Sequence, residues 1–232
     1  MFQTCRGRPK EKGNRMKNKE VFQNGEADQW FRRNKEALEA STSDPDMDLL
    51  ADWMLPFKTR ISSVMEVGCG TGHKLDRLSR ALDAKGCGIE PSAEAVAHIS
   101  DAFPDLNVKQ AFADDIPFNE QFDLVHLGFF LYLVDREAYF SCLKEADRLV
   151  KPGGFLSIID FDPPAPYSNA YSHQPGAFSH KIDNSGAFTA SGLYSVANKY
   201  SFSHSNFHFD EVADERVSLV LLYKETDVFG AR

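Results

Sequence analysis

One stretch of the sequence decides the fold, and it reads Val64-Met65-Glu66-Val67-Gly68-Cys69-Gly70-Thr71-Gly72. Its first part completes a short apolar run, which predicts a strand over residues 61–67. The run passes directly into glycines, which let a ligand approach the backbone because no side chain stands in the way. Open parallel sheets bind ligands just beyond the carboxyl ends of their strands. The stretch therefore predicts a ligand-binding turn between a strand and a helix.

The spacing of the glycines distinguishes this turn from two common nucleotide-binding motifs. The dinucleotide fingerprint GxGxxG needs a glycine at position 73, where this chain has His73. The sequence also contains no GxxxxGK[ST] phosphate loop. The glycine pattern thus favours neither motif.

Strand and helix patterns alternate along the chain around this turn. Apolar runs predict strands over residues 61–67, 86–90, 107–111, 122–127, 155–161 and 217–223. Apolar residues at helical spacing lie between most of these runs, and they also predict helices over 26–40, from 44 to 55 and around Leu193–Tyr200. Strands that alternate with helices of this length predict an α/β fold with a doubly wound, mostly parallel sheet.

Five motifs follow one another in order through residues 61–161. The first is ExGxGxG, which Glu66, Gly68, Gly70 and Gly72 match position by position. The other four are residues 86–90, which end in an acid, and residues 113–118, 122–125 and 149–154. In these motifs the chain resembles the class I (Rossmann-like) S-adenosylmethionine-dependent methyltransferases. The resemblance implies a seven-stranded, mostly parallel sheet flanked by helices, with N-terminal helices as a lid, and S-adenosylmethionine as the cofactor that leaves as S-adenosylhomocysteine.

The same resemblance implies where the cofactor binds. Glu90 would accept hydrogen bonds from the ribose hydroxyls, and Asp114 or Asp115 would accept one from the adenine amine. Arg33, on the lid helix, would reach the cofactor's carboxylate. The remaining predicted contacts are the motif residues Glu66, Gly68, Cys69, Gly70 and Gly72 and the apolar side chains Ile116 and Leu127. The chemistry requires no metal, so no metal site is predicted.

The acceptor is expected to bind in the parts of the chain that vary between such proteins, which here are residues 20–56, 126–135 and 160–190. These segments are rich in aromatic residues and carry modest charge, which suggests a small organic acceptor. Many relatives have a histidine after the fourth strand, but this chain reads Phe130-Leu131-Tyr132-Leu133. The general base is therefore open among four candidates, which are Asp160, His126, Tyr132 and His173.

The pattern divides the chain into a basic tail and one domain. Residues 1–22 are expected to be a disordered basic tail, and residues 23–232 a single class I methyltransferase domain. Within that domain we expect a helical lid (23–57) and a cofactor-binding core (58–161). Residues 162–232 are expected to hold an acceptor-side insertion, a helix and a terminal strand.

Charge and composition limit the partners. The formal net charge is −8, although residues 1–20 alone carry +5, so the body of the chain is strongly acidic. An acidic body is a poor partner for nucleic acid, which favours basic surfaces. No apolar run is long enough to span a bilayer, and the four cysteines form no CxxC pair, so a reduced, cytoplasmic protein is expected. The oligomeric state stays open.

Two alternative functions remain open at this point. The basic tail motivates an RNA- or protein-directed methyltransferase. The missing histidine after the fourth strand motivates a non-catalytic partner or sensor that binds S-adenosylmethionine. A weaker resemblance, over residues 25–34 and 215–224, is to small bacterial methyltransferases associated with surface-sugar biosynthesis, and it suggests sugar-type acceptors.

Overall fold

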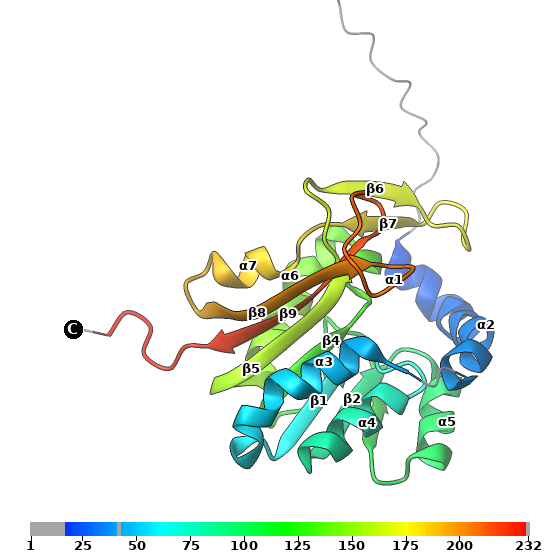
Figure 1. The fold of residues 1–232 in the computed structure, drawn as a ribbon. Coiled ribbons are helices and arrows are strands. Elements are labelled where there is room, and N and C mark those ends of the chain that lie inside the picture. Colours follow the sequence, from blue (N-terminus) through cyan, green and yellow to red (C-terminus); the bar gives the residue numbers. More distant parts are fainter. Residues whose placement is uncertain (1–16, 41–42, 231–232) are drawn as a thin grey trace, which may run out of the picture.

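A seven-stranded sheet forms the centre of the structure, a computed structural model that describes residues 17–40 and 43–230 (Figure 1). The strand order is β3-β2-β1-β4-β5-β9-β8. The first five strands in this order are parallel to one another, whereas β9 is antiparallel to both of its neighbours. Their bounds are Ser63–Val67 (β1), Lys85–Glu90 (β2), Asn107–Gln110 (β3), Phe122–Gly128 (β4), Val150–Phe161 (β5), Tyr194–Ser203 (β8) and Arg216–Lys224 (β9). The predicted fold class is confirmed.

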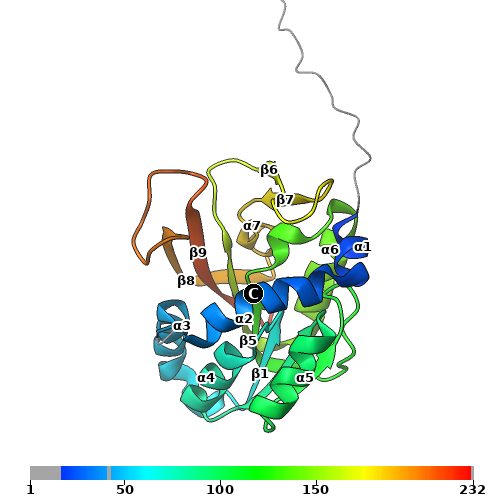
Figure 2. The ribbon, with the colours of Figure 1, turned by 90° about the vertical axis from the view of Figure 1, so that its right-hand side faces the viewer.

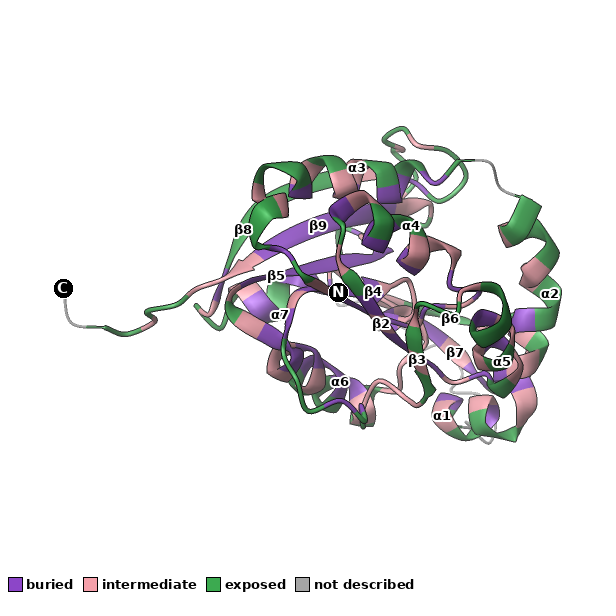
Figure 3. Cartoon of the chain, turned by 90° about the horizontal axis from the view of Figure 1, so that it is seen from below, coloured by how far each residue is buried: buried purple, intermediate pink, exposed green. Residues whose placement is uncertain are grey.

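Helices cover both faces of this sheet (Figure 2). One face packs against Pro45–Met54 (α3), His73–Leu82 (α4) and Ala93–Ala102 (α5), and the other against Arg136–Leu149 (α6) and Ser185–Thr189 (α7). Successive strand residues alternate between the faces, so Val64 joins the cluster under α3 and α4, whereas Met65 joins the one under α6. Figure 3 shows the buried strands enclosed by helices whose outer surfaces are exposed.

The helices begin where the sequence supplies a cap or a proline. Pro45 stands in the first turn of α3, as predicted, and a short 3₁₀ helix, Leu55–Arg60, follows that helix. Ser92 caps α5, because its hydroxyl accepts a hydrogen bond of 3.0 Å from the N–H of Ala95. A second 3₁₀ turn, Leu131–Leu133, leads from β4 to α6. None of the described helices is both long and apolar enough to cross a membrane.

The N-terminal helices lie across the end of the sheet to which the parallel strands point (Figure 2). They are Asn18–Val21 (α1) and Ala27–Ala40 (α2), joined by a π-helical turn, Phe22–Glu26. The prediction that the disordered tail extends to residue 22 is wrong for residues 18–22. The Asn18 side chain donates to the carbonyls of Leu133 (2.8 Å) and Phe178 (2.6 Å), and its backbone N–H donates to Asp135 (3.0 Å). Residues 1–16, the rest of that predicted tail, lie outside the described residues.

The region after β5 differs from its prediction. A two-stranded hairpin of Tyr167–Ala170 (β6) and Phe178–Lys181 (β7) precedes α7. The helix predicted around Leu193–Tyr200 is wrong, because these residues belong to β8. Val196 and Tyr200 have helical spacing but are exposed, and β8 gains its stability from backbone pairing with β9 and from the buried residues Tyr194 and Phe202 at its two ends.

Candidate active site

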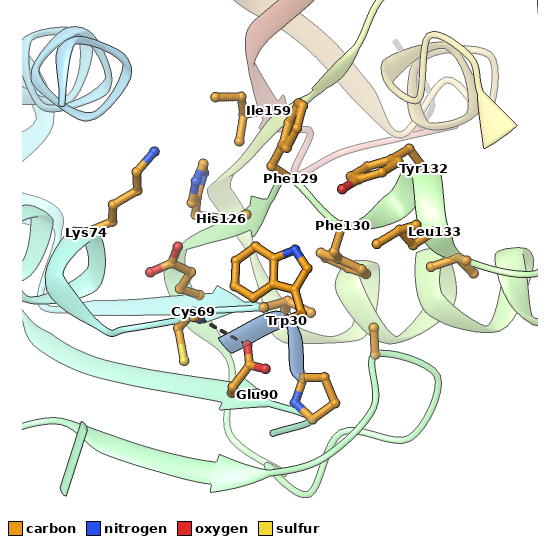
Figure 4. Close-up of a pocket in the computed structure, with 18 of the residues that line it drawn as sticks. Trp30, Cys69, Lys74, Glu90, His126, Phe129, Phe130, Tyr132, Leu133 and Ile159 are labelled. Carbon is orange, nitrogen blue, oxygen red and sulfur yellow. Dashed lines mark hydrogen bonds between the residues drawn. The ribbon is translucent and has the colours of Figure 1, made fainter. Parts of the chain in front are cut away.

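A cavity of about 740 Å³ opens at the carboxyl ends of the parallel strands (Figure 4). One end is walled by the glycine turn after β1, the end of β2 and the loop after β3. The other end is walled by the end of β4, the start of α3 and the loop 203–207 that follows β8. Trp30, from α2, lines the cavity between these ends. This is the position at which open parallel sheets bind their ligands.

The glycine turn is tied to the end of the neighbouring strand. The N–H groups of Gly68 and Cys69 donate to the carbonyl of Ile89, at 2.9 and 3.2 Å. The N–H of Gly70 donates to the carboxylate of Glu90 at 3.0 Å. Gly72, at the start of α4, has a φ of +80°, a left-handed conformation that favours glycine. These bonds hold the turn open as one wall of the cavity.

Glu90 is a buried acid at the end of β2. It accepts hydrogen bonds from the N–H of Gly70 and, at 3.1 Å, from that of Ser92. Burial raises the pKa of Glu90 to about 7, although both hydrogen bonds act in the opposite direction. Its side chain lines the cavity, where it can accept hydrogen bonds from ligand hydroxyls.

The structure separates the other predicted cofactor residues into two groups. Asp114 lines the cavity and forms an ion pair of 2.6 Å with Lys19 of α1. Asp115 is exposed, outside the cavity wall. Ile116 and Leu127 are buried in the core cluster that packs against α6, also behind the wall.

Arg33 has a different partner from the one predicted. Its guanidinium forms an ion pair with the buried carboxylate of Glu26, which also accepts from Tyr171 (3.1 Å) and Gln174 (3.0 Å). This cluster joins α2 to the loop before β7, away from the cavity wall. The predicted contact between Arg33 and the cofactor's carboxylate stays a prediction, and it requires this ion pair to break. Trp30 of the same helix reaches the cavity instead.

Two buried polar groups face the cavity without a hydrogen-bond partner among the described residues. They are Oε2 of Glu66 and Nε2 of His126. Burial raises the pKa of Glu66 to about 8, opposed by the positive charge of Lys74. Burial and the same charge lower the pKa of His126 to about 3. The other ring nitrogen of His126, Nδ1, lies 3.1 Å from Oγ of Ser157.

The far end of the cavity is aromatic. Phe129 follows β4 with a φ of +60°, a conformation that is rare for a bulky residue and often found at functional sites. Its ring stacks on that of His204, with centroids 5.6 Å apart and planes inclined by 22°, and it packs against Tyr132 at 5.3 Å. Loop 203–207 was not predicted as part of the site. A strand that ends beside the cavity would have indicated that the loop after it belongs to the site. The spacing of apolar residues instead predicted a helix around Leu193–Tyr200, so this indication was missed.

The four predicted candidates for the general base lie in different environments. Asp160 is buried outside the wall, where it accepts from the N–H groups of Tyr132 (3.1 Å) and Phe161 (2.7 Å), and burial raises its pKa to about 7. Burial also raises the pKa of Tyr132, which lines the cavity. His173 is exposed and packs on Tyr171. Only His126 combines burial, a place in the wall and an unpaired ring nitrogen.

Within residues 17–40 and 43–230, no group of three or more His, Cys, Asp or Glu side chains is arranged to hold a metal ion. The ring of His204 packs against those of Phe129 and Phe161, which also contact each other at 5.2 Å.

Several solved structures with this fold are methyltransferases. The chain is similar to 1,6-didemethyltoxoflavin-N1-methyltransferase of Burkholderia thailandensis, solved with 1,6-didemethyltoxoflavin and S-adenosylhomocysteine (TM-score 0.66, 11% identity, 89% of this chain and 90% of that one). It is also similar to the N-methyltransferase NodS of Bradyrhizobium japonicum, solved with S-adenosylhomocysteine (TM-score 0.58, 15% identity, 85% and 98%). The fold is that of the class I S-adenosylmethionine-dependent methyltransferases.

Sequence comparison supports the same class for the central part of the chain. Residues 64–154 match the methyltransferase domain family. An uncharacterized methyltransferase of Synechocystis sp. is 29% identical over 103 residues (44% of this chain, 48% of the relative). Demethylmenaquinone methyltransferase of Chlorobaculum parvum is 30% identical over 102 residues (44% and 42%). The chain spans about half the length of these curated relatives. Residues 64–154 therefore resemble a methyltransferase domain, in agreement with the fold.

Proposed function

We propose that this protein transfers a methyl group from S-adenosylmethionine to a small organic acceptor. One observation carries the proposal: a single cavity of about 740 Å³ joins the glycine turn and Glu90 to an aromatic end. The cofactor supplies an activated methyl group on a positively charged sulfur. The protein's part is to hold the two molecules in line and to accept a proton where the acceptor loses one.

The residues at the first end of the cavity fit this cofactor. Glu90 offers a buried carboxylate to the ribose hydroxyls, and Asp114 offers one to the adenine amine once Lys19 moves aside. The unpaired Oε2 of Glu66 fits the cofactor's ammonium group, which would supply the missing hydrogen bond. Gly70 leaves room for the ligand, since a Cβ there would project toward Trp30 at 3.8 Å.

A small acceptor is favoured by the shape and lining of the second end. Apolar and aromatic side chains with a few convergent polar groups are typical of small-molecule sites. The names of two similar proteins also mention small organic compounds, demethylmenaquinone and 1,6-didemethyltoxoflavin. An RNA or protein acceptor is disfavoured by the acidic body of the chain.

We also propose that residues 23–232 work as one methyltransferase domain. In this arrangement residues 23–57, together with α1, cover the cofactor, residues 58–161 bind it, and residues 162–232 complete the acceptor side. The hydrogen bonds of Asn18 to residues 133–135 and to Phe178 support the inclusion of α1 in this lid.

The test is a calorimetric titration with S-adenosylhomocysteine, with NAD as the control ligand. We expect the wild type to bind S-adenosylhomocysteine and not NAD. Glu90→Ala should weaken binding about 10- to 100-fold, because hydrogen bonds to a charged group contribute about 1.5–3 kcal/mol. Glu120→Ala, which removes an exposed acid, should leave the affinity unchanged. If the folded wild type does not bind S-adenosylhomocysteine, the proposal is wrong.

Turnover is tested separately with S-adenosylmethionine that carries a tritiated methyl group. We expect label to appear in at least one compound of a broad panel of small organic acceptors. Binding of the cofactor without transfer to any acceptor in the panel would instead favour the non-catalytic partner or sensor.

A further inference from the structure

The aromatic end of the cavity has the form of a site for a flat ring. Phe129 and His204 stack nearly parallel, and Tyr132 closes on Phe129 from the side. The strained backbone at Phe129 directs its ring into the cavity, and Ile159 lies beside it (Figure 4). Aromatic rings stack favourably on such surfaces in offset geometry. The surface therefore fits a planar aromatic molecule.

A row of polar residues crosses the floor beside this surface. Glu66 on β1, His126 on β4 and Ser157 on β5 are direct neighbours in the sheet. All three are buried, and His126 points into the cavity between Lys74 and Phe129 (Figure 4). Its unpaired Nε2 needs a partner, because a buried polar atom without a hydrogen bond costs about 1–3 kcal/mol. A ligand hydroxyl at this end of the cavity would supply that partner.

We propose that His126, oriented by Ser157, takes the proton from a hydroxyl group on a planar aromatic acceptor that stacks on Phe129. This inference rests on the proposed function, and it adds the acceptor class and the proton-accepting group. The Nδ1–H of His126 donates to Oγ of Ser157, which leaves the lone pair of Nε2 directed at the acceptor. The acceptor oxygen attacks the methyl carbon and displaces sulfur, which keeps the electron pair of the broken bond. The O–H proton passes to Nε2, and the products are a methyl ether and a protonated His126.

The environment of His126 keeps its ring uncharged before the transfer. Burial and the charge of Lys74 lower its pKa to about 3, so the neutral imidazole predominates throughout the neutral range and the protonated form is disfavoured. A weak base suffices, because the hydroxyl becomes strongly acidic as its oxygen bonds to carbon. The charged or titratable groups around the ring are Glu66 on β1, Lys74 on α4 and Asp46 on α3. The positive charge of Lys74 disfavours protonated His126, and the negative charge of Asp46 favours it. These two residues form an ion pair of 2.6 Å with each other, so their opposite effects on His126 partly cancel.

The test measures transfer of tritiated methyl from S-adenosylmethionine to phenol, catechol, 4-nitrophenol and 2-naphthol. The variants are His126→Gln and His126→Asn. Each replaces the imidazole with a side-chain amide that can still form a hydrogen bond with Ser157. His173→Ala is the control, since that histidine is exposed and outside the cavity. We expect the wild type to methylate at least one phenol. Both His126 variants should lower kcat about 100- to 1000-fold, the range usual for a positioned proton acceptor, and should bind S-adenosylhomocysteine within about threefold of wild type.

A second readout follows the imidazole itself. In ¹⁵N spectra of the complex with S-adenosylhomocysteine, His126 should carry its proton on Nδ1, and 4-nitrophenol should shift the Nε2 signal. Ser157→Ala should remove the preference for this tautomer and lower kcat with little change in KM for the phenol. If His126 served only in packing, 4-nitrophenol would not shift its Nε2 signal, and loss of the tautomer preference in Ser157→Ala would leave kcat unchanged.

The outcomes separate this inference from the proposed function. Transfer to a phenol at the wild-type rate in both His126 variants would overturn it. So would intact binding of S-adenosylhomocysteine with no transfer to any phenol, which leaves the cofactor assignment standing. A wild type that does not bind S-adenosylhomocysteine would remove the proposed function and this inference together.

Discussion

Replacement of Glu90 by glutamine should make the protein more resistant to alkaline pH while it weakens the cofactor site. The carboxyl group of Glu90 is buried, and burial raises its pKa from 4.5 to about 7. A carboxyl group with a higher pKa in the folded chain than in the unfolded chain favours folding at low pH. It opposes folding increasingly as the pH rises from 4.5 to about 7, and the effect is complete above that range. Glutamine carries no charge and lacks this dependence.

The size of the effect follows from the two pKa values. One pKa unit corresponds to about 1.36 kcal/mol, so the full destabilisation by ionised Glu90 is about 3 kcal/mol. Part of it is already present at about pH 6, and the further loss between about pH 6 and pH 8.5 is about 1–2 kcal/mol. The wild type should lose this amount of unfolding free energy relative to Glu90→Gln over that interval. Titrating groups that do not interact with Glu90 contribute equally to both proteins and cancel in the comparison. Glu66, whose pKa the charge of Glu90 raises, adds to the difference in the same direction.

The assay is urea unfolding of both proteins at about pH 6 and about pH 8.5, with Glu120→Gln as a control at an exposed acid. The control should follow the wild type at both pH values. Glu90→Gln should also bind S-adenosylhomocysteine about 5- to 30-fold more weakly, because a neutral acceptor makes weaker hydrogen bonds than a carboxylate. The prediction would be refuted if the unfolding free energies of wild type and Glu90→Gln changed by the same amount between the two pH values. Burial would then not disfavour the ionised form of Glu90.

Two further substitutions test the packing around the site. Gly72→Ala should lower the unfolding free energy by about 1–3 kcal/mol, as measured by urea unfolding. The reason is that φ is +80° there and that the new Cβ would lie 2.8 Å from Cγ1 of Ile99. An unfolding free energy within about 0.5 kcal/mol of wild type would contradict this prediction. Glu26→Ala leaves the guanidinium of Arg33 without its buried partner and should speed limited proteolysis within residues 17–40 several-fold. Glu36→Ala, at an exposed acid of α2, is its control, and equal cleavage of the two variants would contradict a role for Glu26 in holding the helix down.

The position of the residues proposed to bind the cofactor could be predicted from the sequence, because each of them lies close to the end of a strand. Glu66 to Gly72 and Glu90 each follow a strand, and parallel strands bring their carboxyl ends to one edge. Knowledge of the strand order was therefore enough to place them together. Asp114 and Asp115 were left as alternatives, since a sequence does not show which of two neighbouring side chains turns inward. The structure places Asp114 in the wall.

Other features depend on contacts between distant residues, and the sequence pattern misjudged these. The spacing of Val196 and Tyr200 is helical, yet pairing with β9 over the whole length of β8 outweighs that local preference. Arg33 forms an ion pair with Glu26, seven positions earlier, directly after a kink at which Gly25 has a φ of +113°. Neither the pairing nor the kink has a signature in the nearby sequence that a periodicity could detect.

The two ends of the cavity differ in where their residues come from, and this has a consequence for function. The segment that matches the methyltransferase domain family, residues 64–154, contributes Glu66, Glu90 and Asp114, which is the part of the wall suited to the cofactor. The same segment also contributes Phe129 and Tyr132 to the aromatic end, whereas His204 and the rest of loop 203–207 come from outside it. The loop is therefore the part of the aromatic end that does not belong to the matched segment. Exchange of loop 203–207 should therefore alter the choice of acceptor and leave cofactor binding in place, since the loop and the glycine turn belong to different edges of the same cavity.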